Sequence, residues 1–182
     1  LTGNIHPMYS YALYIQNFYM AVDGYGSHWL SVTWSLAIEE QFYMILPLLI
    51  FLLNRKNIIR VAIVGVILSP ILRASTGPLT DHWLGAYVLL PMRMDALLIG
   101  VIIAHLQLTG KIEEWFASEK KTLLALIGLC LIFTITLVVW KDGAETGGIF
   151  NHSLFAVMYG LVLIYALVSE NSIGGKILSW KI

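Results

Sequence analysis

Long apolar stretches separated by short polar segments dominate this chain and restrict what it can fold into. A helix needs about 20 apolar residues to cross the hydrocarbon core of a bilayer. Of the 182 residues, 58% are hydrophobic and 12% are charged, which is typical of proteins that cross the membrane several times. We therefore predict an all-α, polytopic bundle of transmembrane helices that forms a single membrane domain over residues 1–182. The five predicted spans cover residues 31–53, 58–72, 83–108, 122–140 and 150–168.

The positions of lysine and arginine predict how these spans are oriented. Loops on the cytoplasmic side of a membrane carry an excess of both residues. Eight of the eleven basic residues flank the first and third connections or follow the last span, so we assign these segments to the cytoplasmic side. The first span then begins at the extracytoplasmic face. The eight residues are Arg55, Lys56, Arg60, Lys111, Lys120, Lys121, Lys176 and Lys181.

Two shorter segments predict helices that lie at the membrane surface. Residues 8–22 are rich in tyrosine and phenylalanine but are too short and too polar to cross the bilayer, so we expect an aromatic-rich interfacial helix. Residues 109–121 mix charges with aromatic residues and predict a short amphipathic helix on the cytoplasmic surface. The expected apolar stripe of the first helix consists of Tyr11, Tyr14, Ile15, Phe18 and Val22.

The composition also argues against several classes of protein. The formal net charge is zero, so the chain lacks the basic surface that nucleic-acid binding requires. Its one cysteine, Cys130, lies in an apolar run and cannot form an internal disulfide. No histidine and glutamate spacing resembles a metal-binding motif, so we expect neither a metal nor a bound cofactor. From its composition, the chain is expected to have the lipid bilayer as a partner.

Two adjacent glutamates, Glu39 and Glu40, lie inside the first predicted span. A charged side chain at the centre of a bilayer costs roughly 2.5–3.5 kcal/mol even on permissive scales, so such residues usually belong to functional sites. Both carboxylates lie about 10 Å below the start of the span. Ser35, Glu39 and Tyr43 share one helical face at intervals of four residues. The alternative is a purely structural pair that holds helices together through hydrogen bonds or an arginine.

Arg93 and Asp95 form a second charged group, about 15 Å into the third predicted span. Because they are two residues apart, they point to nearly opposite faces of a helix and cannot pair across one turn. We expect Glu39 or Glu40 to be the counter-charge of Arg93. Pro91 is expected to kink the helix just above these charges. A structural counter-ion role is the open alternative for Arg93.

Two further features carry smaller predictions. Gly100 and Ala104 lie one turn apart on the third span and suit close contact with another helix. His28 lies in an extracytoplasmic segment, where an imidazole is suited to accept a proton or to contact a substrate.

Two sequence blocks resemble the acyltransferase-3 family of integral-membrane sugar O-acyltransferases. The first is TWSLAIEEQFY at residues 33–43, followed by Pro47, and the second is PMRMDALLIG at residues 91–100, which resembles an Arg-x-Asp-x-Leu-x-x-Gly pattern. There are departures from the family. Many members have a histidine where this chain has Val32. The family's Arg and His pair in its first membrane helices and its C-terminal Gly-x-x-Ser-Tyr block are both absent from this sequence.

The resemblance implies a bacterial enzyme of the cytoplasmic (inner) membrane that transfers an acyl group, usually acetyl, from acyl-CoA to a saccharide hydroxyl. The acceptor would be an extracellular or cell-envelope saccharide such as a polysaccharide or lipopolysaccharide. The chain would be an internal fragment of a larger multi-span domain, inactive alone, with its catalytic base in an N-terminal part that this sequence lacks. Supporting catalytic roles would fall to Glu39, Glu40 and Arg93, and substrate contacts to Trp34, Ser35, Tyr43, Asp95 and His28.

Two other functions fit the charged residues within the spans. In a secondary transporter, the carboxylates and Arg93 would carry protons or bind a solute near the middle of the membrane. No inverted repeat supports this alternative, but the composition permits it. In a structural membrane subunit, the charges would only specify how helices pair. The acceptor sugar, the acyl chain and the oligomeric state stay open.

Overall fold

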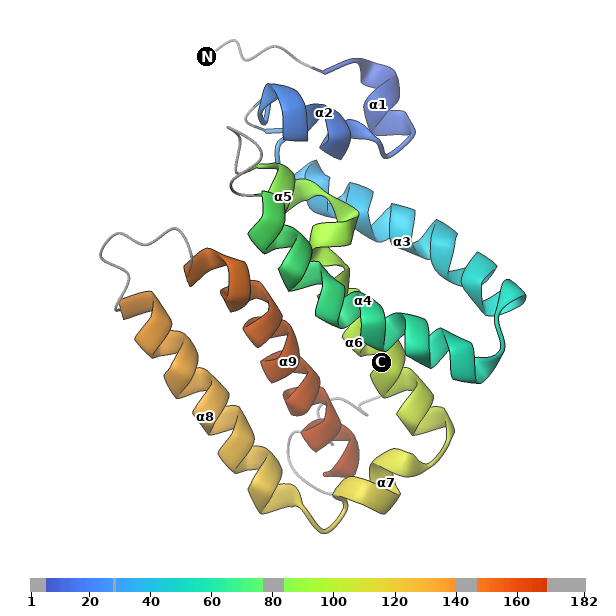
Figure 1. Cartoon of the computed structure of the whole chain (residues 1–182), viewed down its shortest axis with the longest axis vertical. Coiled ribbons are helices and arrows are strands. Elements are labelled where there is room, and N and C mark those ends of the chain that lie inside the picture. The colour runs from blue at the N-terminus through green and yellow to red at the C-terminus, as the bar shows by residue number, and fades with distance from the viewer. Residues whose placement is uncertain (1–5, 28, 77–83, 140–146, 170–182) are drawn as a thin grey trace, which may run out of the picture. The chain divides into compact units, whose positions relative to one another are not determined.

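The computed structural model describes residues 6–27, 29–76, 84–139 and 147–169 (Figure 1). Within these residues all regular secondary structure is helical and there is no strand, which confirms the predicted all-α, polytopic bundle. Among the described helices, four are long and apolar enough to cross a membrane. They are Thr33–Leu52, Arg55–Ser75, Gly85–Leu108 and Asn151–Val168. The remaining predicted span, 122–140, falls on helix α8 (Lys120–Val139), and its crossing of the bilayer stays a prediction.

The chain divides into two compact units, Leu1–Leu97 and Leu98–Ile182, with the boundary inside helix α6 (Leu90–Leu108). The prediction that both belong to one membrane domain is untested. The first unit contains α1 (Met8–Ala12), α2 (Gln16–Asp23), α3 (Thr33–Leu52), α4 (Arg55–Thr76) and α5 (Gly85–Val88). In Figure 1, α2 lies beside the N-terminal end of α3, and it packs against both α3 and α5.

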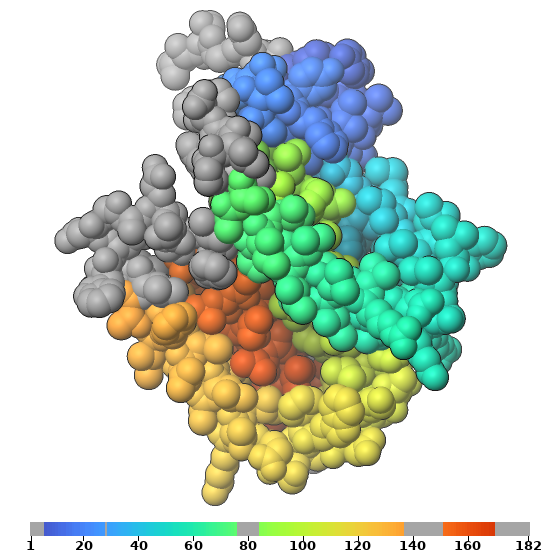
Figure 2. Space-filling model, viewed as in Figure 1, coloured from blue at the N-terminus to red at the C-terminus, as the bar shows by residue number. Residues whose placement is uncertain are grey.

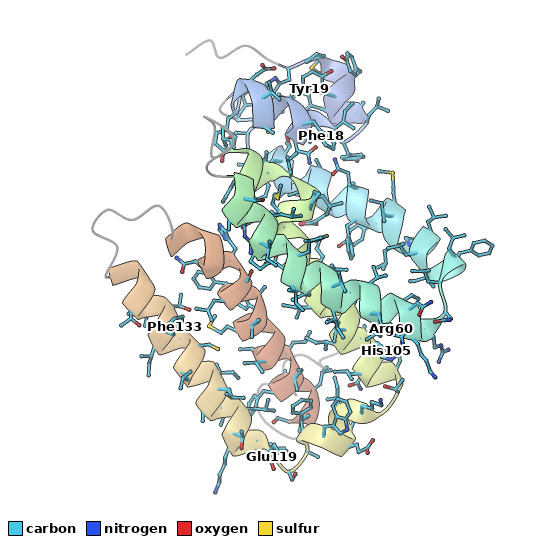
Figure 3. All side chains as sticks on the ribbon, in the orientation of Figure 1. Phe18, Tyr19, Arg60, His105, Glu119 and Phe133 are labelled. Carbon is cyan, nitrogen blue, oxygen red and sulfur yellow. The ribbon has the colours of Figure 1, made fainter. Side chains whose placement is uncertain are left out.

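The aromatic-rich N-terminal segment forms two helices rather than the one continuous helix predicted. The chain turns at Tyr14, whose φ of 55° is in the left-handed region that few residues other than glycine adopt. Because of this turn, α1 and α2 do not share the predicted apolar stripe. Phe18 is exposed, whereas Asn17 and Met20 are buried against neighbouring helices. The Tyr9 and Tyr19 hydroxyls lie 2.7 Å apart and join the two helices. Figure 3 labels Tyr19 on α2.

Helix α4 is longer than the 15-residue span predicted at 58–72. It begins directly after Asn54, whose side-chain oxygen accepts a hydrogen bond of 2.9 Å from the backbone N–H of Asn57. An asparagine in this position satisfies an amide at the helix start that would otherwise lack a partner. Arg60 then lies one turn inside the helix, is exposed, and donates to the Asn57 side chain.

The third predicted span is interrupted at Leu89, which has an extended ψ of 140° and separates α5 from α6. Pro91 follows two residues later. Proline has no N–H and its ring collides with the carbonyl four residues earlier, so it disfavours a continuous helix across Tyr87–Pro91. The predicted kink is therefore present as a complete break in the helix.

The second unit contains the end of α6 together with α7 (Lys111–Phe116), α8 (Lys120–Val139) and α9 (Gly147–Val168). The short helix predicted within 109–121 is α7. Figure 2 shows the side chains of α8 (orange) against those of α9 (red), and Figure 3 labels the exposed Phe133 on α8. A buried core joins all four helices through Ile103, Ile112, Leu123 and Ile164.

The glycine that brings two helices close together in the second unit is Gly160 on α9, not Gly100. A Cβ atom at Gly160 would lie 2.9 Å from Cγ2 of Ile99 and 3.3 Å from Cδ1 of Ile103. Gly100 is exposed, and a Cβ atom placed there would meet nothing within 4 Å. The predicted packing role of Gly100 is therefore wrong for the described part of the chain.

Candidate active site

Arg93 lies against two aromatic rings in the first unit. Its guanidinium carbon is 5.3 Å from the ring centroid of Trp34 and 4.7 Å from that of Tyr87. The two rings are themselves in contact, with centroids 4.7 Å apart and an interplanar angle of 54°. A guanidinium over an aromatic face is attracted by the negative charge of the ring quadrupole. We call Arg93, Trp34 and Tyr87 the Arg93 cradle. The two rings hold the guanidinium but carry no negative charge that would neutralise it.

Three separate chain segments position the Arg93 cradle. Trp34 is in the first turn of α3, Tyr87 is near the end of α5, and Arg93 is the fourth residue of α6. The break at Leu89 allows Tyr87 and Arg93, only six residues apart, to come from two different helices. Beneath the rings lies a buried apolar cluster formed by Met20, Leu84 and Val88.

Tyr25 lies next to the cradle, in the segment between α2 and α3. It packs against the same apolar cluster as Trp34 and Tyr87. Burial raises the pKa of Tyr25 above its ordinary value of 10.0, the neighbouring Tyr87 acts in the same direction, and the positive charge of Arg93 offsets part of the increase. The phenol is therefore a neutral hydroxyl near the Arg93 guanidinium at physiological pH.

Asp95 is paired with Arg73, a residue that the sequence analysis placed in a loop. Nη2 of Arg73 lies 2.8 Å from Oδ2 of Asp95, and both side chains are only 2% exposed. Arg73 also donates a hydrogen bond to the backbone oxygen of Met92. Asp95 therefore does not neutralise Arg93 directly, and its predicted contact with substrate would require it to act from within a buried ion pair.

A network of buried amides holds α2, α3 and α5 together. Nε2 of Gln41 donates to Oδ1 of Asn17 at 2.9 Å, and Nδ2 of Asn17 donates to Oε1 of Gln41 at 3.3 Å. Asn17 also donates to the carbonyl of Val88 at 3.2 Å, and Gln41 to that of Tyr14 at 2.6 Å. The Val88 and Tyr14 carbonyls belong to the interrupted helix and to the left-handed turn. The amide pair thus satisfies backbone groups at both irregular points of the unit.

The paired glutamates do not form the ion pair with Arg93 that the sequence predicted. Among the described residues, the ion pair within the first unit joins Arg73 and Asp95, and neither Glu39 nor Glu40 contacts a cation. Glu39 is exposed and Glu40 is half-buried. The buried stripe of α3 consists instead of Ala37, Ile38, Gln41 and Phe42.

The remaining predicted site residues do not gather around Arg93 as one cluster. Ser35 donates its hydroxyl to the carbonyl of Val32 at 3.1 Å, within its own helix. Tyr43 is 55% exposed, and its ring lies 6.3 Å from that of Phe42. His28 lies outside the described residues. Of the predicted substrate contacts, Trp34 is the one whose ring lies against Arg93.

Arg73, Tyr87 and the amide pair were not among the predicted site residues. Arg73 lies beyond the predicted end of its span, but the longer α4 includes it. Gln41 stands inside the first block of the resemblance, where an uncharged polar residue in an apolar helix could have indicated a buried partner. Among the described residues, no group of three or more His, Cys, Asp or Glu side chains could hold a metal ion.

These features define a polytopic α-helical membrane protein with an aromatic-lined cationic site. The sequence is similar to O-acetyltransferase OatA of Staphylococcus aureus strains NCTC 8325 / PS 47, COL and MRSA252, each 29% identical over 157 residues. The match covers 81% of this chain but 25% of each relative, so the chain spans about a quarter of the length of the curated relatives it matches. No protein-family model and no solved structure matches the chain.

Proposed function

We propose that this chain is part of a membrane-bound O-acyltransferase of the acyltransferase-3 type in the bacterial cytoplasmic membrane. The enzyme transfers an acetyl group from acetyl-CoA to a hydroxyl of a cell-envelope saccharide. The observation that carries this proposal is the similarity to O-acetyltransferase OatA over 81% of the chain. A matched stretch of this length includes Arg93, which would supply a cation for the reaction.

The chemistry of acyl transfer explains why a cation held against aromatic rings is useful. When a sugar hydroxyl attacks the thioester carbonyl, a base removes the hydroxyl proton and negative charge develops on the carbonyl oxygen. The tetrahedral intermediate then collapses and releases coenzyme A as the thiol after it gains a proton. Arg93 would donate hydrogen bonds to the developing oxyanion, or to a phosphate of the donor, through N–H groups that its contacts with the two rings leave available.

Supporting roles follow from burial. Glu40, which is half-buried, would orient the base, and Tyr25 and Trp34 would line the space occupied by substrate. The base itself belongs to a part of the protein outside these 182 residues in this proposal. Glu39 and Tyr43 lie on an exposed face of α3, so we assign them no direct role beside Arg93.

The proposal is tested with the complete gene expressed in a host that lacks its own saccharide O-acetyltransferase. Ester-linked acetate is released from purified envelope saccharide by mild alkali and measured for the unchanged protein, Arg93→Ala and Glu40→Gln. The matched control is Arg60→Ala, because Arg60 is an exposed arginine away from the cradle. Membrane levels of each variant are measured in parallel by immunoblotting.

We expect Arg93→Ala to lose most of the acetate while Arg60→Ala retains it. Acetylation that persists in both Arg93→Ala and Glu40→Gln would contradict the site assignment. An envelope without acetate from the unchanged protein would contradict the function itself. Solute uptake that is lost in Arg93→Ala, with acetate unaffected, would favour the transporter alternative.

A further inference from the structure

Arg73 contacts helix α6 at two points, one on either side of Arg93 in the sequence. Its Nη1 group donates a hydrogen bond to the backbone oxygen of Met92, and its Nη2 group lies 2.8 Å from Oδ2 of Asp95. The other carboxylate oxygen of Asp95, Oδ1, accepts a hydrogen bond of 3.1 Å from the backbone N–H of Ala96. Because both of its oxygens have donors, the Asp95 carboxylate is held in one direction.

The geometry of a helix relates this contact to the direction of Arg93. Successive residues are turned by about 100° around the helix axis, so Arg93 and Asp95 are about 160° apart on α6. With Asp95 directed to Arg73 on α4, Arg93 lies on the nearly opposite side of α6, where it meets Trp34 and Tyr87. A rotation of this turn of helix that moved Asp95 would therefore move Arg93 as well.

The first turn of α6 needs such an anchor. Leu89, just before it, is extended, so the rotation of α6 is not set by a continuous helix from α5. Pro91, within the first turn, has no N–H to contribute. A guanidinium must lie within about 6 Å of a ring centroid for a cation–π attraction. The guanidinium carbon of Arg93 lies 5.3 and 4.7 Å from its two centroids, which leaves little room for the helix to turn.

We propose that Arg73 is a positioning residue for Arg93. By holding the Met92 carbonyl and the Asp95 carboxylate, Arg73 fixes the rotation of α6 that places the Arg93 guanidinium against the two rings of the cradle. The two contacts come from two nitrogens of one planar guanidinium, a geometry that the single ammonium group of lysine does not reproduce. The effect of Arg73 on acetyl transfer rests on the proposed function, whereas its effect on the placement of Arg93 does not.

The first experiment reports on the cradle directly. In the complete protein, 5-fluorotryptophan is incorporated at position 34 alone, and its fluorine resonance is recorded by NMR in detergent. Arg93→Ala gives the resonance of the ring without the guanidinium. We expect Arg73→Lys to move the resonance toward that of Arg93→Ala, and Arg60→Lys to leave it unchanged. Arg60 is the matched control because it is an exposed arginine on the same helix as Arg73.

The proposal is overturned if Arg73→Lys keeps the resonance of the unchanged protein, or if Arg93→Ala itself does not move it. Thermal unfolding shows whether each variant is folded. Where Arg73→Lys does not give folded protein, Asp95→Asn takes its place, because asparagine has the same shape and still offers Arg73 an oxygen. The resonance should then move in the same direction by a smaller amount, and an unmoved resonance would overturn the proposal.

A kinetic experiment asks whether Arg73 acts through Arg93. Arg73→Lys should reduce acetyl transfer by roughly 10- to 100-fold, since a displacement of about 1 Å in a reacting site can cost this much. In the Arg93→Ala background the same substitution should cause no further loss, because the group that it positions is gone. Equal fold-losses in the two backgrounds would indicate a purely structural role and would overturn the proposal.

The two experiments separate this proposal from the proposed function. Absence of acetyl transfer by the unchanged protein would contradict the proposed function alone. The fluorine resonance at position 34 would then still decide whether Arg73 positions Arg93.

Discussion

Arg73 and Asp95 form a buried ion pair between α4 and α6, with their nearest atoms 2.8 Å apart. Each residue alone would place an uncompensated charge inside a membrane-embedded unit. The pair also directs two neighbouring charges on α6 to different partners. Asp95 contacts Arg73, whereas Arg93 contacts the aromatic rings. Within the described residues, the carboxylate on the same helix as Arg93 is therefore paired with a second arginine rather than with Arg93.

We predict that breaking this pair destabilises the protein more than removing it. Arg73→Met or Asp95→Leu should each lower the free energy of unfolding by about 3–5 kcal/mol, because the remaining charge stays buried without a partner. The double variant should recover much of that loss. Unfolding of the complete protein in mild detergent, titrated with a denaturing detergent, measures the effect. Arg60→Met serves as the control and should change stability by less than about 0.5 kcal/mol. A double variant less stable than both single variants would contradict the prediction.

The amide pair should show a different pattern. Gln41→Leu removes both hydrogen bonds to Asn17 and leaves that buried side chain with one partner, at a cost of about 1–3 kcal/mol. Adding Asn17→Leu should not restore stability fully, because the Val88 carbonyl then loses its donor as well. The same denaturation experiment measures both variants. A double variant as stable as the unchanged protein would show that the bond to Val88 contributes little.

Trp34 should affect activity through its ring face rather than its size. A cation–π contact contributes about 0.5–2 kcal/mol, which corresponds to about a 2- to 30-fold change in rate. We expect Trp34→Leu to reduce acetyl transfer by a factor in that range and Trp34→Phe to reduce it less. Trp115→Leu is the control, since Trp115 on α7 makes a similar contact with Lys111 within the second unit. Equal losses in Trp34→Leu and Trp34→Phe would argue against a role for the ring face.

Close packing in the second unit should make Gly160 sensitive to even one added carbon. Gly160→Ala places a methyl group 2.9 Å from Cγ2 of Ile99, and overpacking of this kind costs about 1–3 kcal/mol. Ile99→Leu removes that branch and should relieve part of the loss when combined with Gly160→Ala. Gly100→Ala should be neutral or slightly stabilising, because its position is open and alanine favours a helix. Thermal unfolding in detergent compares the three variants with the unchanged protein, and equal loss from both glycine substitutions would refute the packing argument.

The raised pKa of Tyr25 predicts a loss of stability in alkali. Burial is the largest cause of the raised pKa. It keeps the Tyr25 phenol protonated in the folded state at pH values above 10.0, where the same phenol has ionised in the unfolded chain. The stabilising contribution is therefore complete below pH 10.0 and is lost as the pH rises through the higher folded-state pKa. We expect Tyr25→Phe to lose less stability than the unchanged protein between neutral pH and this range. Tyr159→Phe, an exposed tyrosine on α9, should decline as the unchanged protein does.

Hydropathy was sufficient to predict the helical class and most helix positions, because crossing a bilayer imposes a length that can be counted. It could not predict which helix faces are buried. The sequence placed the interior side of α3 at Glu39, whereas the buried stripe contains Gln41 and its neighbours. In an apolar solvent both faces of a helix are hydrophobic, so periodicity does not distinguish lipid from protein.

The candidate site was predicted only in part for a related reason. Arg93 and Trp34 were both identified, and the structure brings them together. Their common neighbour Tyr87 was not identified, because the contact depends on the break at Leu89 and on which residues the break turns toward α3. The partner of Asp95 was missed because the end of α4 was placed too early, before Arg73. Long-range pairing of single polar residues leaves no periodic pattern in a sequence.

The interruption at Leu89 has an electrical consequence. A helix that starts inside the membrane brings its own N-terminal end there, and the aligned peptide dipoles give that end roughly half a positive elementary charge. Arg93 is in the first turn of α6, so the dipole and the guanidinium add to the same field. Water would normally screen such a field, but hydrocarbon does so far less. The break at Leu89 thereby makes the region around Arg93 more attractive to negative charge than the Arg93 guanidinium alone would.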